Sequence, residues 1–149
     1  MSKRKKIRCN EDICMGCSIC AVACSLAHTP DIDNQFLISK NYKLESRNVV
    51  ACRNAKSFMN SCKNCKEAPC IKACVSGAIT RNKNENTVIN AEKCIACWTC
   101  IMVCPNGAIR MRDTGDGKKY SVKCDLCENS DIPACVKACP NQALSVVEE

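Results

Sequence analysis

The stretch CIACWTCIMVCPNGAI, residues 94–109, holds four cysteines within eleven residues and a proline directly after the last of them. The first three cysteines follow one another at steps of three residues, and the fourth comes four residues later. Thiolate sulfur is a soft ligand, suited to zinc and to iron–sulfur clusters. The spacing therefore predicts a site that binds metal through Cys94, Cys97, Cys100 and Cys104.

Three further groups of four cysteines repeat this pattern, and two cysteines, Cys9 and Cys52, lie outside all groups. The first group has the C-x2-C-x2-C-x3-C spacing of the third, whereas the second and fourth have middle gaps of four and seven residues. Groups two, three and four are followed by VSGAI, PNGAI and PNQAL, which indicates internal repeats. The other three groups are Cys14, Cys17, Cys20 and Cys24; Cys62, Cys65, Cys70 and Cys74; and Cys124, Cys127, Cys135 and Cys139.

The apolar content of the chain is low once cysteine is set aside. Hydrophobic residues make up 46% of the 149 residues, but this figure includes 18 cysteines, and the aromatic residues are one Trp, two Tyr and two Phe. A chain of this length forms one domain or two very small ones. With so thin a core, such a domain is usually held together by disulfides or metal.

The N-terminal stretch MSKRKKIRC is basic, but no apolar run of roughly 7–15 residues follows it, as a secretory signal requires, and the paired arginines of a twin-arginine signal are missing. No stretch approaches the roughly 20 apolar residues of a membrane span. We therefore expect a cytoplasmic protein without a direct membrane span. In that compartment, closely spaced cysteines indicate metal rather than disulfides.

Iron–sulfur clusters suit the spacing better than zinc does. Zinc sites made of four cysteines normally use two separated C-x2-C pairs that form one tetrahedron. In groups one and three, three ligands come from a single loop and the fourth begins a helix that faces away. This is the pattern of bacterial two-cluster ferredoxins, in which the fourth cysteine ligates the other cluster. We therefore expect four 4Fe–4S clusters from motifs that work in pairs, although spacing alone does not say which motifs pair.

The formal charge of +7 changes when clusters are counted. Four oxidised clusters, each carrying −2 with its thiolates, would bring the charge to about −1. The lysine and arginine excess is therefore interpreted as compensation for buried anionic clusters. Nucleic-acid binding is not expected, because the basic residues are scattered and aromatic stacking partners are nearly absent.

Short secondary-structure elements are predicted between the cysteine groups. Residues 5–9 predict a strand, and residues 18–28 have the small-residue pattern of a short helix. Residues 78–90 and 108–123 each predict a hairpin, because a turn rich in Asn, Asp and Gly separates two apolar stretches. Residues 29–50 form the long cysteine-free connection, expected to be partly strand.

The chain resembles the four-cluster ferredoxin-type iron–sulfur subunits of molybdenum and tungsten oxidoreductases, formate dehydrogenases, hydrogenases and carbon monoxide dehydrogenase. The resemblance covers essentially the whole chain and rests on CKNCKEAPCIKAC, CIACWTCIMVCPNGAI and KCDLCENSDIPACVKACP, with proline after Cys104 and Cys139. One departure is Val75 after Cys74, where the family usually has proline. Proline supplies no ligand there, so the departure does not alter the expected ligands.

The resemblance implies an α+β fold of two pseudo-symmetric bacterial ferredoxin-like modules, each with two 4Fe–4S clusters, short helices and β-hairpins. Motifs one and four would form one module, residues 1–28 plus 105–149, and motifs two and three the other, residues 51–104, with 29–50 as the connection. The implied ligand sets are Cys14, Cys17 and Cys20 with Cys139; Cys124, Cys127 and Cys135 with Cys24; Cys62, Cys65 and Cys70 with Cys104; and Cys94, Cys97 and Cys100 with Cys74.

The sequence offers no dinucleotide fingerprint and no nucleophile with an adjacent base. We therefore expect a non-enzymatic subunit that passes single electrons between a catalytic metalloenzyme and a hydrogenase, reductase or ferredoxin. CSLAH after the first motif resembles the iron–sulfur partners of carbon monoxide dehydrogenase and of tungsten aldehyde oxidoreductases, and carbon monoxide dehydrogenase is favoured. The alternatives are a freely diffusing polyferredoxin, or the iron–sulfur subunit of a tungsten aldehyde oxidoreductase or formate dehydrogenase.

Four residues outside the ligand sets receive structural interpretations. His28 is expected to be a surface or capping residue, because sixteen cysteines already satisfy four clusters. Trp98 is expected to pack over a cluster and exclude water. Cys9 and Cys52 are interpreted as small buried hydrophobic residues.

Overall fold

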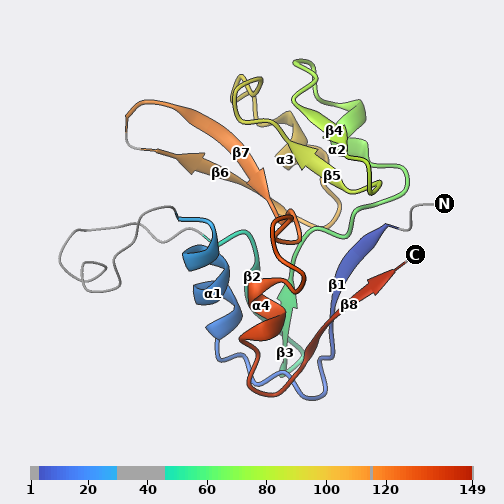
Figure 1. Cartoon of the computed structure of the whole chain (residues 1–149), viewed down its shortest axis with the longest axis vertical. Helices are drawn as coiled ribbons and strands as arrows, with labels where there is room; N and C mark the ends of the chain where they lie inside the picture. Colours follow the sequence, from blue (N-terminus) through green and yellow to red (C-terminus); the bar gives the residue numbers. More distant parts are fainter. Residues whose placement is uncertain (1–3, 30–45, 115, 149) are drawn as a thin grey trace.

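The computed structural model of the chain describes residues 4–29, 46–114 and 116–148, and shows a small α+β fold of short helices and two-stranded sheets (Figure 1). The predicted connection over 29–50 lies mostly outside these residues. The helices are α1 (Ile19–Ala27), α2 (Pro69–Lys72), α3 (Thr99–Val103) and α4 (Ala134–Lys137). The strands are β1 (Lys5–Cys9), β2 (Val49–Arg53), β3 (Lys56–Asn60), β4 (Ile79–Arg81), β5 (Thr87–Ile89), β6 (Ile109–Asp113), β7 (Lys119–Lys123) and β8 (Leu144–Glu148).

All four sheets are antiparallel pairs, and one of them joins the two ends of the described chain. β1 pairs with β8, so that Lys5 lies opposite Glu148 and Cys9 opposite Leu144. The other pairs are β2–β3, β4–β5 and β6–β7, each formed by strands that follow one another in the sequence. The pairing of β1 with β8 places the first cysteine group beside the segment that follows the last one.

Two of the hairpins were predicted from their turns. In the β4–β5 turn, the Asn82 side-chain oxygen accepts hydrogen bonds from the backbone N–H groups of Asn84 and Asn86. In the β6–β7 turn, Gly117 has a φ of +91°. Asparagine and glycine favour these conformations, so both predictions are confirmed, as is the strand over residues 5–9.

The β2–β3 hairpin was not predicted. Its two turn residues, Asn54 and Ala55, both have positive φ, 50° and 60°, as a tight type I′ turn requires. Alanine is an uncommon residue in that conformation, so the usual Asn-Gly signal is missing. The hairpin contacts β1, so it packs beside the strand that leads into the first cysteine group.

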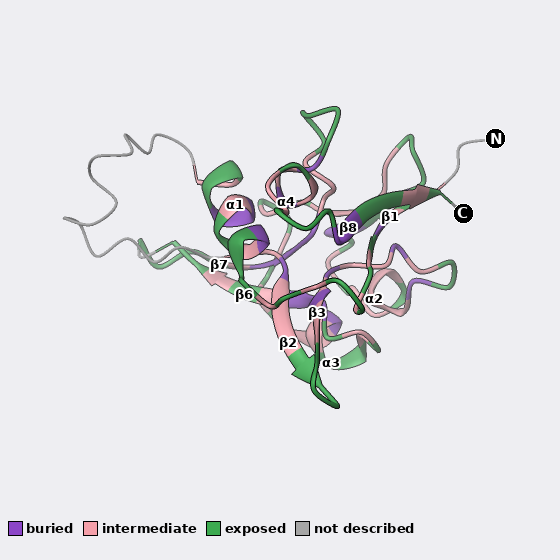
Figure 2. Cartoon of the chain, turned by 90° about the horizontal axis from the view of Figure 1, so that it is seen from below, coloured by how far each residue is buried: buried purple, intermediate pink, exposed green. Residues whose placement is uncertain are grey.

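The longer helices begin one residue before the third cysteine of their groups, directly after a residue in the left-handed conformation. Ser18 and Trp98, both with φ of 62°, precede α1 and α3, and Cys20 and Cys100 are the second residues of these helices. α1 confirms the helix predicted within residues 18–28. It has one buried and one exposed face (Figure 2).

The elements gather in two parts of the molecule (Figure 1). In one, α1 contacts α4, α4 contacts β8, and β1 contacts β3. In the other, α2 contacts α3 and β4, and β5 contacts β7. Each part has a small core in which cysteines sit beside aliphatic residues, such as Ile7 and Leu144 in the first and Ile79 and Ile109 in the second. Within the described part of the chain, no helix has the length and apolar character needed to cross a membrane.

Candidate iron–sulfur sites

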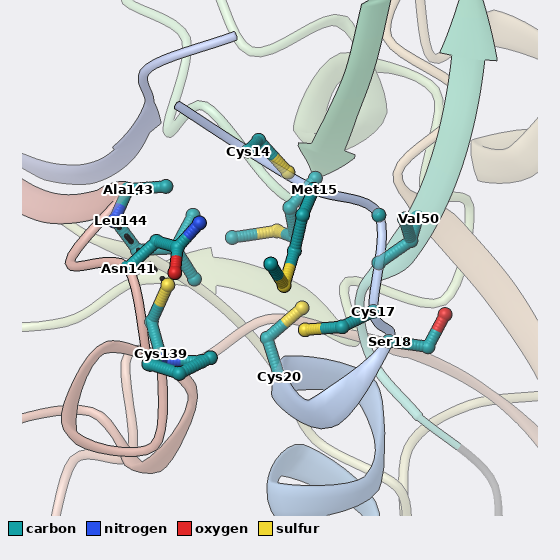
Figure 3. A pocket seen from close by; sticks show the side chains of 13 residues that line it. Cys14, Met15, Cys17, Ser18, Cys20, Val50, Cys139, Asn141, Ala143 and Leu144 are labelled. Atoms are coloured by element: carbon teal, nitrogen blue, oxygen red, sulfur yellow. Dashed lines mark hydrogen bonds between the residues drawn. The ribbon is translucent and has the colours of Figure 1, made fainter. Parts of the chain in front are cut away.

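Four cysteines, one of them from the far end of the chain, line one cavity. Their sulfur atoms turn toward a common centre (Figure 3). Three belong to the loop before α1 and to its first turn, and the fourth follows α4. Much of the remaining wall is apolar and includes Met59 and Leu144. We call this cavity site 1, formed by Cys14, Cys17, Cys20 and Cys139.

Two further cavities also bring together cysteines of different groups. In the first of them, the Asn106 side-chain amide donates a hydrogen bond to Cys65 Sγ at 3.4 Å. In the second, Trp98 forms part of the wall, where packing over the site was predicted. Site 2 comprises Cys62, Cys65, Cys70 and Cys104, and site 3 comprises Cys74, Cys94, Cys97 and Cys100.

The remaining four cysteines of the motifs lie near one another, and three of them are buried. Cys24, Cys124 and Cys135 are 4%, 8% and 3% exposed. Burial raises the pKa of Cys135, and Cys24, Cys124 and Cys127 lie close enough for their charges to raise it further. We call this group site 4, formed by Cys24, Cys124, Cys127 and Cys135.

Three of the buried thiols are poorly suited to ionise without a metal. Burial raises the pKa of Cys20 to about 11 and the pKa of Cys124 and Cys135 to about 12, because a thiolate loses its hydration there. A coordinated metal reverses this effect, since its positive charge deprotonates the bound thiol. Cys24 differs from these thiols: burial opposes its ionisation, but hydrogen bonds with His28 and the Arg47 backbone lower its pKa.

Backbone amides donate hydrogen bonds to several of the sulfur atoms. After the last cysteine of groups three and four, the chain turns through Gly107 and Gln142, with φ of 55° and 52°. This turn brings the next N–H back to the cysteine four residues earlier, which explains the repeated PNGAI and PNQAL. The bonds run from Ala108 to Cys104 Sγ at 3.4 Å and from Ala143 to Cys139 Sγ at 3.3 Å.

Each site has cysteines that pack close to those of a neighbouring site. Cys20 of site 1 lies in one core with Cys124 and Cys135 of site 4, and Cys62 of site 2 packs against this core. Sites 2 and 3 share one core, which contains Cys70, Cys74, Cys100 and Cys104. The order is therefore site 1, site 4, site 2 and site 3, with sites 1 and 3 at the ends.

A hydrogen-bonded group of polar residues lies against Cys24 in site 4. His28 Nε2 is 2.9 Å from Asp125 Oδ1, and Arg47 Nη1 is 2.5 Å from Asp125 Oδ2. The backbone N–H of Arg47 donates to Cys24 Sγ at 3.4 Å. Hydrogen bonds to Asp125 and Cys24 raise the pKa of His28 to about 10. Burial opposes ionisation of Asp125, but the hydrogen bond from His28 and the charge of Arg47 hold its pKa well below the usual range.

The sequence identified only part of this group. His28 caps the C-terminus of α1 as predicted, but its side chain is only 10% exposed, so the surface interpretation is wrong. Asp125 and Arg47 were not singled out. They meet His28 and Cys24 across long sequence separations that no local pattern reveals.

The two cysteines outside the groups differ in burial. Cys52 is exposed on β2, so its interpretation as a buried residue is wrong. Cys9 is half-buried, and its sulfur accepts a hydrogen bond from the Met59 N–H at 3.4 Å. Burial raises the pKa of the Cys9 thiol, and the neighbouring Cys14 of site 1 adds to this effect.

The donor sets and their surroundings fit iron–sulfur clusters. In sites 1 to 3, four sulfur atoms line one cavity, and amide groups donate to some of these sulfurs. Fe–S clusters are held by four cysteine thiolates and are tuned by hydrogen bonds to sulfur and by burial. Together with the small α+β fold, these features define a ferredoxin-type electron-transfer protein.

Comparison with known proteins identifies the family. Residues 53–149 match the family described as 4Fe-4S dicluster domain, and the chain belongs to this family. It is 34% identical to an iron-sulfur protein of Rhodospirillum rubrum, over 95% of this chain and 81% of that protein. It is 37% identical to the electron transport protein HydN of Escherichia coli strain K12, over 91% of this chain and 83% of HydN.

Among known structures, the active site complex BamBC of benzoyl coenzyme A reductase, in complex with benzoyl-CoA, contains a similar chain. The TM-score is 0.51 at 25% sequence identity, over 99% of this chain and 81% of that chain. The similarity of fold therefore extends over nearly the whole sequence.

Proposed function

We propose that the chain holds four 4Fe–4S clusters, one at each site, and passes single electrons between a catalytic metalloenzyme and a second redox protein. The observation that carries this proposal is the presence of four neighbouring groups of four cysteines, three of which line cavities. A bound 4Fe–4S cluster supplies reversible uptake of one electron at a potential set by its surroundings. The cysteines would hold the clusters, and the apolar walls would exclude water.

The ligands are proposed to cross between motifs. Cys104 would complete the site of the second motif, and Cys74 that of the third. Likewise, Cys139 would complete the site of the first motif, and Cys24 that of the fourth. The shared cavity walls of sites 1 to 3 support this pairing. It would make two ferredoxin-like modules, one from motifs one and four and one from motifs two and three, with the boundaries expected from the sequence.

Electrons are proposed to enter and leave through sites 1 and 3. Each of these end sites has an exposed cysteine, Cys17 in site 1 and Cys97 in site 3. Beside them lie the exposed side chains of Met15, 62% exposed, and Ile95, 65% exposed. An apolar surface beside a redox site allows a partner protein to approach closely, because little hydration must be removed.

The proposal assigns no substrate chemistry to this chain, so the partner must carry out the reaction that makes or consumes electrons. Carbon monoxide dehydrogenase is our favoured partner class, on the resemblance of CSLAH after the first motif. A tungsten aldehyde oxidoreductase or a formate dehydrogenase is the second choice. A freely diffusing polyferredoxin is the alternative function.

An anaerobic pull-down of the tagged chain from its native host tests the proposal, with iron counted per chain and co-purifying proteins identified. A stoichiometric metalloenzyme and about sixteen iron atoms per chain would support the electron-transfer subunit. The same iron content with no bound protein would favour the polyferredoxin. A colourless protein containing zinc would contradict both functions.

A further inference from the structure

Sites 1 and 3, at the ends of the order given above, differ from the interior sites 2 and 4 in the charged side chains around them. Among the described residues, those that line site 1 and site 3 include no charged side chain. The residues that line site 2 include two lysines, Lys63 and Lys123, and no carboxylate. At site 4, the His28 ring lies 3.7 Å from Cys24 Sγ, and one carboxylate, Asp125, lies between this ring and the guanidinium of Arg47.

Lys123 is the most unusual of these cations because it is buried. It is the last residue of β7, only 4% exposed, and it directly precedes Cys124 of site 4. Its ammonium group donates a hydrogen bond to the Cys124 carbonyl oxygen at 2.9 Å. No carboxylate in the described part of the chain forms an ion pair with it.

Lys123 lies between the two interior sites. It lines the cavity of site 2 together with Cys70 and Cys104. It also acts electrostatically on Cys70 of site 2 and on Cys124 of site 4. A buried ammonium group is costly unless an anion compensates it. The thiolates of these two sites would supply negative charge close to it once they hold metal.

We propose that the buried positive charge of Lys123 favours reduction of sites 2 and 4. These two sites would then hold the first electrons, and sites 1 and 3 would connect them to the partners. The inference rests on the proposed electron-transfer function and adds how electrons are distributed along it. Reduction adds one negative charge to a site, so a fixed buried cation favours the reduced state. Each step moves one electron, and no bond is made or broken.

Holding electrons in the interior has a functional consequence. Two interior sites can take up two electrons, one each, while the exposed end sites stay oxidised. A catalytic partner that releases electrons in pairs could then deliver both to this chain. The chain would pass them on singly to a carrier that accepts one electron at a time.

The test is an anaerobic redox titration of the full-length protein, followed by electron paramagnetic resonance, in the wild type and in Lys123→Met. Methionine keeps the length of the side chain and removes its charge. At a fixed potential, we expect the ratio of reduced to oxidised clusters at sites 2 and 4 to fall by about tenfold, with sites 1 and 3 unaffected. Lys119→Met, on the exposed part of the same strand, is the matched control and should shift no site.

The signals are assigned with variants that each remove one cluster, Cys104→Ala for site 2 and Cys24→Ala for site 4. If Lys123→Met loses iron, Lys63→Met provides a second test, because this half-buried lysine also lines site 2, and only site 2 should shift. If the wild type holds four clusters and neither Lys123→Met nor Lys63→Met changes the ratio of reduced to oxidised clusters, only this inference is wrong. A wild type without four clusters would instead overturn the proposed function.

Discussion

At the scale of single residues, Gly16 in the first cysteine loop has no space for a side chain. Its φ is +72°, and a Cβ atom there would lie 2.6 Å from Ser57 Oγ. Both the backbone conformation and the contact oppose a larger residue. We expect Gly16→Ala to lower the free energy of unfolding by about 1–3 kcal/mol, measured by anaerobic denaturant titration.

Gly107→Ala is the matched control. Gly107 also has a positive φ, +55°, but a Cβ atom there would meet nothing within 4 Å. It should therefore show the backbone cost without the contact. Equal losses for the two variants would show that Ser57 does not restrict Gly16. If Ser57→Gly in the Gly16→Ala background recovers the difference, the contact is its cause.

A second prediction for single residues concerns the cysteines that line the site of another motif. Cys104 lines site 2 although it belongs to the third motif, and Cys74 lines site 3 although it belongs to the second. We expect Cys104→Ala to damage the site 2 cluster and Cys74→Ala the site 3 cluster, because each removes one of four ligands. Iron content and electron paramagnetic resonance report which cluster is lost. The reverse result in this reciprocal pair would refute the crossed assignment.

The spacing of the cysteines in the sequence indicates which of them are ligands, but it does not identify the residues that surround them. Ligands at steps of three residues are recognisable because a loop of that length wraps one cluster. The group around Cys24 leaves no such signature, since Asp125 is 97 residues from His28 and 78 from Arg47. Lys123 has no local signal either, because its burial depends on the cavity that it lines.

At the scale of secondary-structure elements, the β1–β8 pair anchors the first core. Ile7 on β1 is 1% exposed and lies opposite Val146, which is 37% exposed. Ile7 belongs to the core that contains Cys20, Cys124 and Cys135. We expect Ile7→Ala to cost about 2–4 kcal/mol of stability in anaerobic unfolding, because it leaves a cavity beside these cysteines.

Val146→Ala on the partner strand is the control for this prediction. It shortens a side chain at the same position of the sheet, but one that is partly exposed. We expect a loss below about 1 kcal/mol. A similar loss for both variants would show that this position contributes to stability through the pairing of β1 with β8 rather than through the core.

Local turn chemistry determined which elements the sequence revealed. The hairpins β4–β5 and β6–β7 were predictable, because an Asn side chain accepts backbone hydrogen bonds within a turn and Gly favours positive φ. The β2–β3 turn uses Ala55, which carries no such preference. The β1–β8 pair joins residues at opposite ends of the chain, and no pattern along the sequence predicts so distant a partner.

At the scale of the whole molecule, the cores depend on cysteine. Cys20, Cys124 and Cys135 account for half of the buried residues in the first core, alongside Ile7, Met59 and Leu144. The second core has Cys100 beside Ile79 and Ile109. Apolar burial alone is therefore small for a chain of 149 residues. Binding of the iron–sulfur clusters must contribute much of the stability, because cluster binding to a folded site is coupled to folding.

Removal of iron tests this dependence. We expect an anaerobic chelator to abolish the cooperative unfolding transition and to reduce the circular dichroism of the helices and strands, in step with loss of absorption near roughly 400 nm. The reduced cysteines would then be neutral thiols, and the chain would carry its formal charge of +7 with few anions in its interior to compensate it. Cys52→Ala, at an exposed cysteine outside the four sites, should keep both iron and stability. An iron-free chain that still unfolds cooperatively would mean that the aliphatic residues alone can hold the fold.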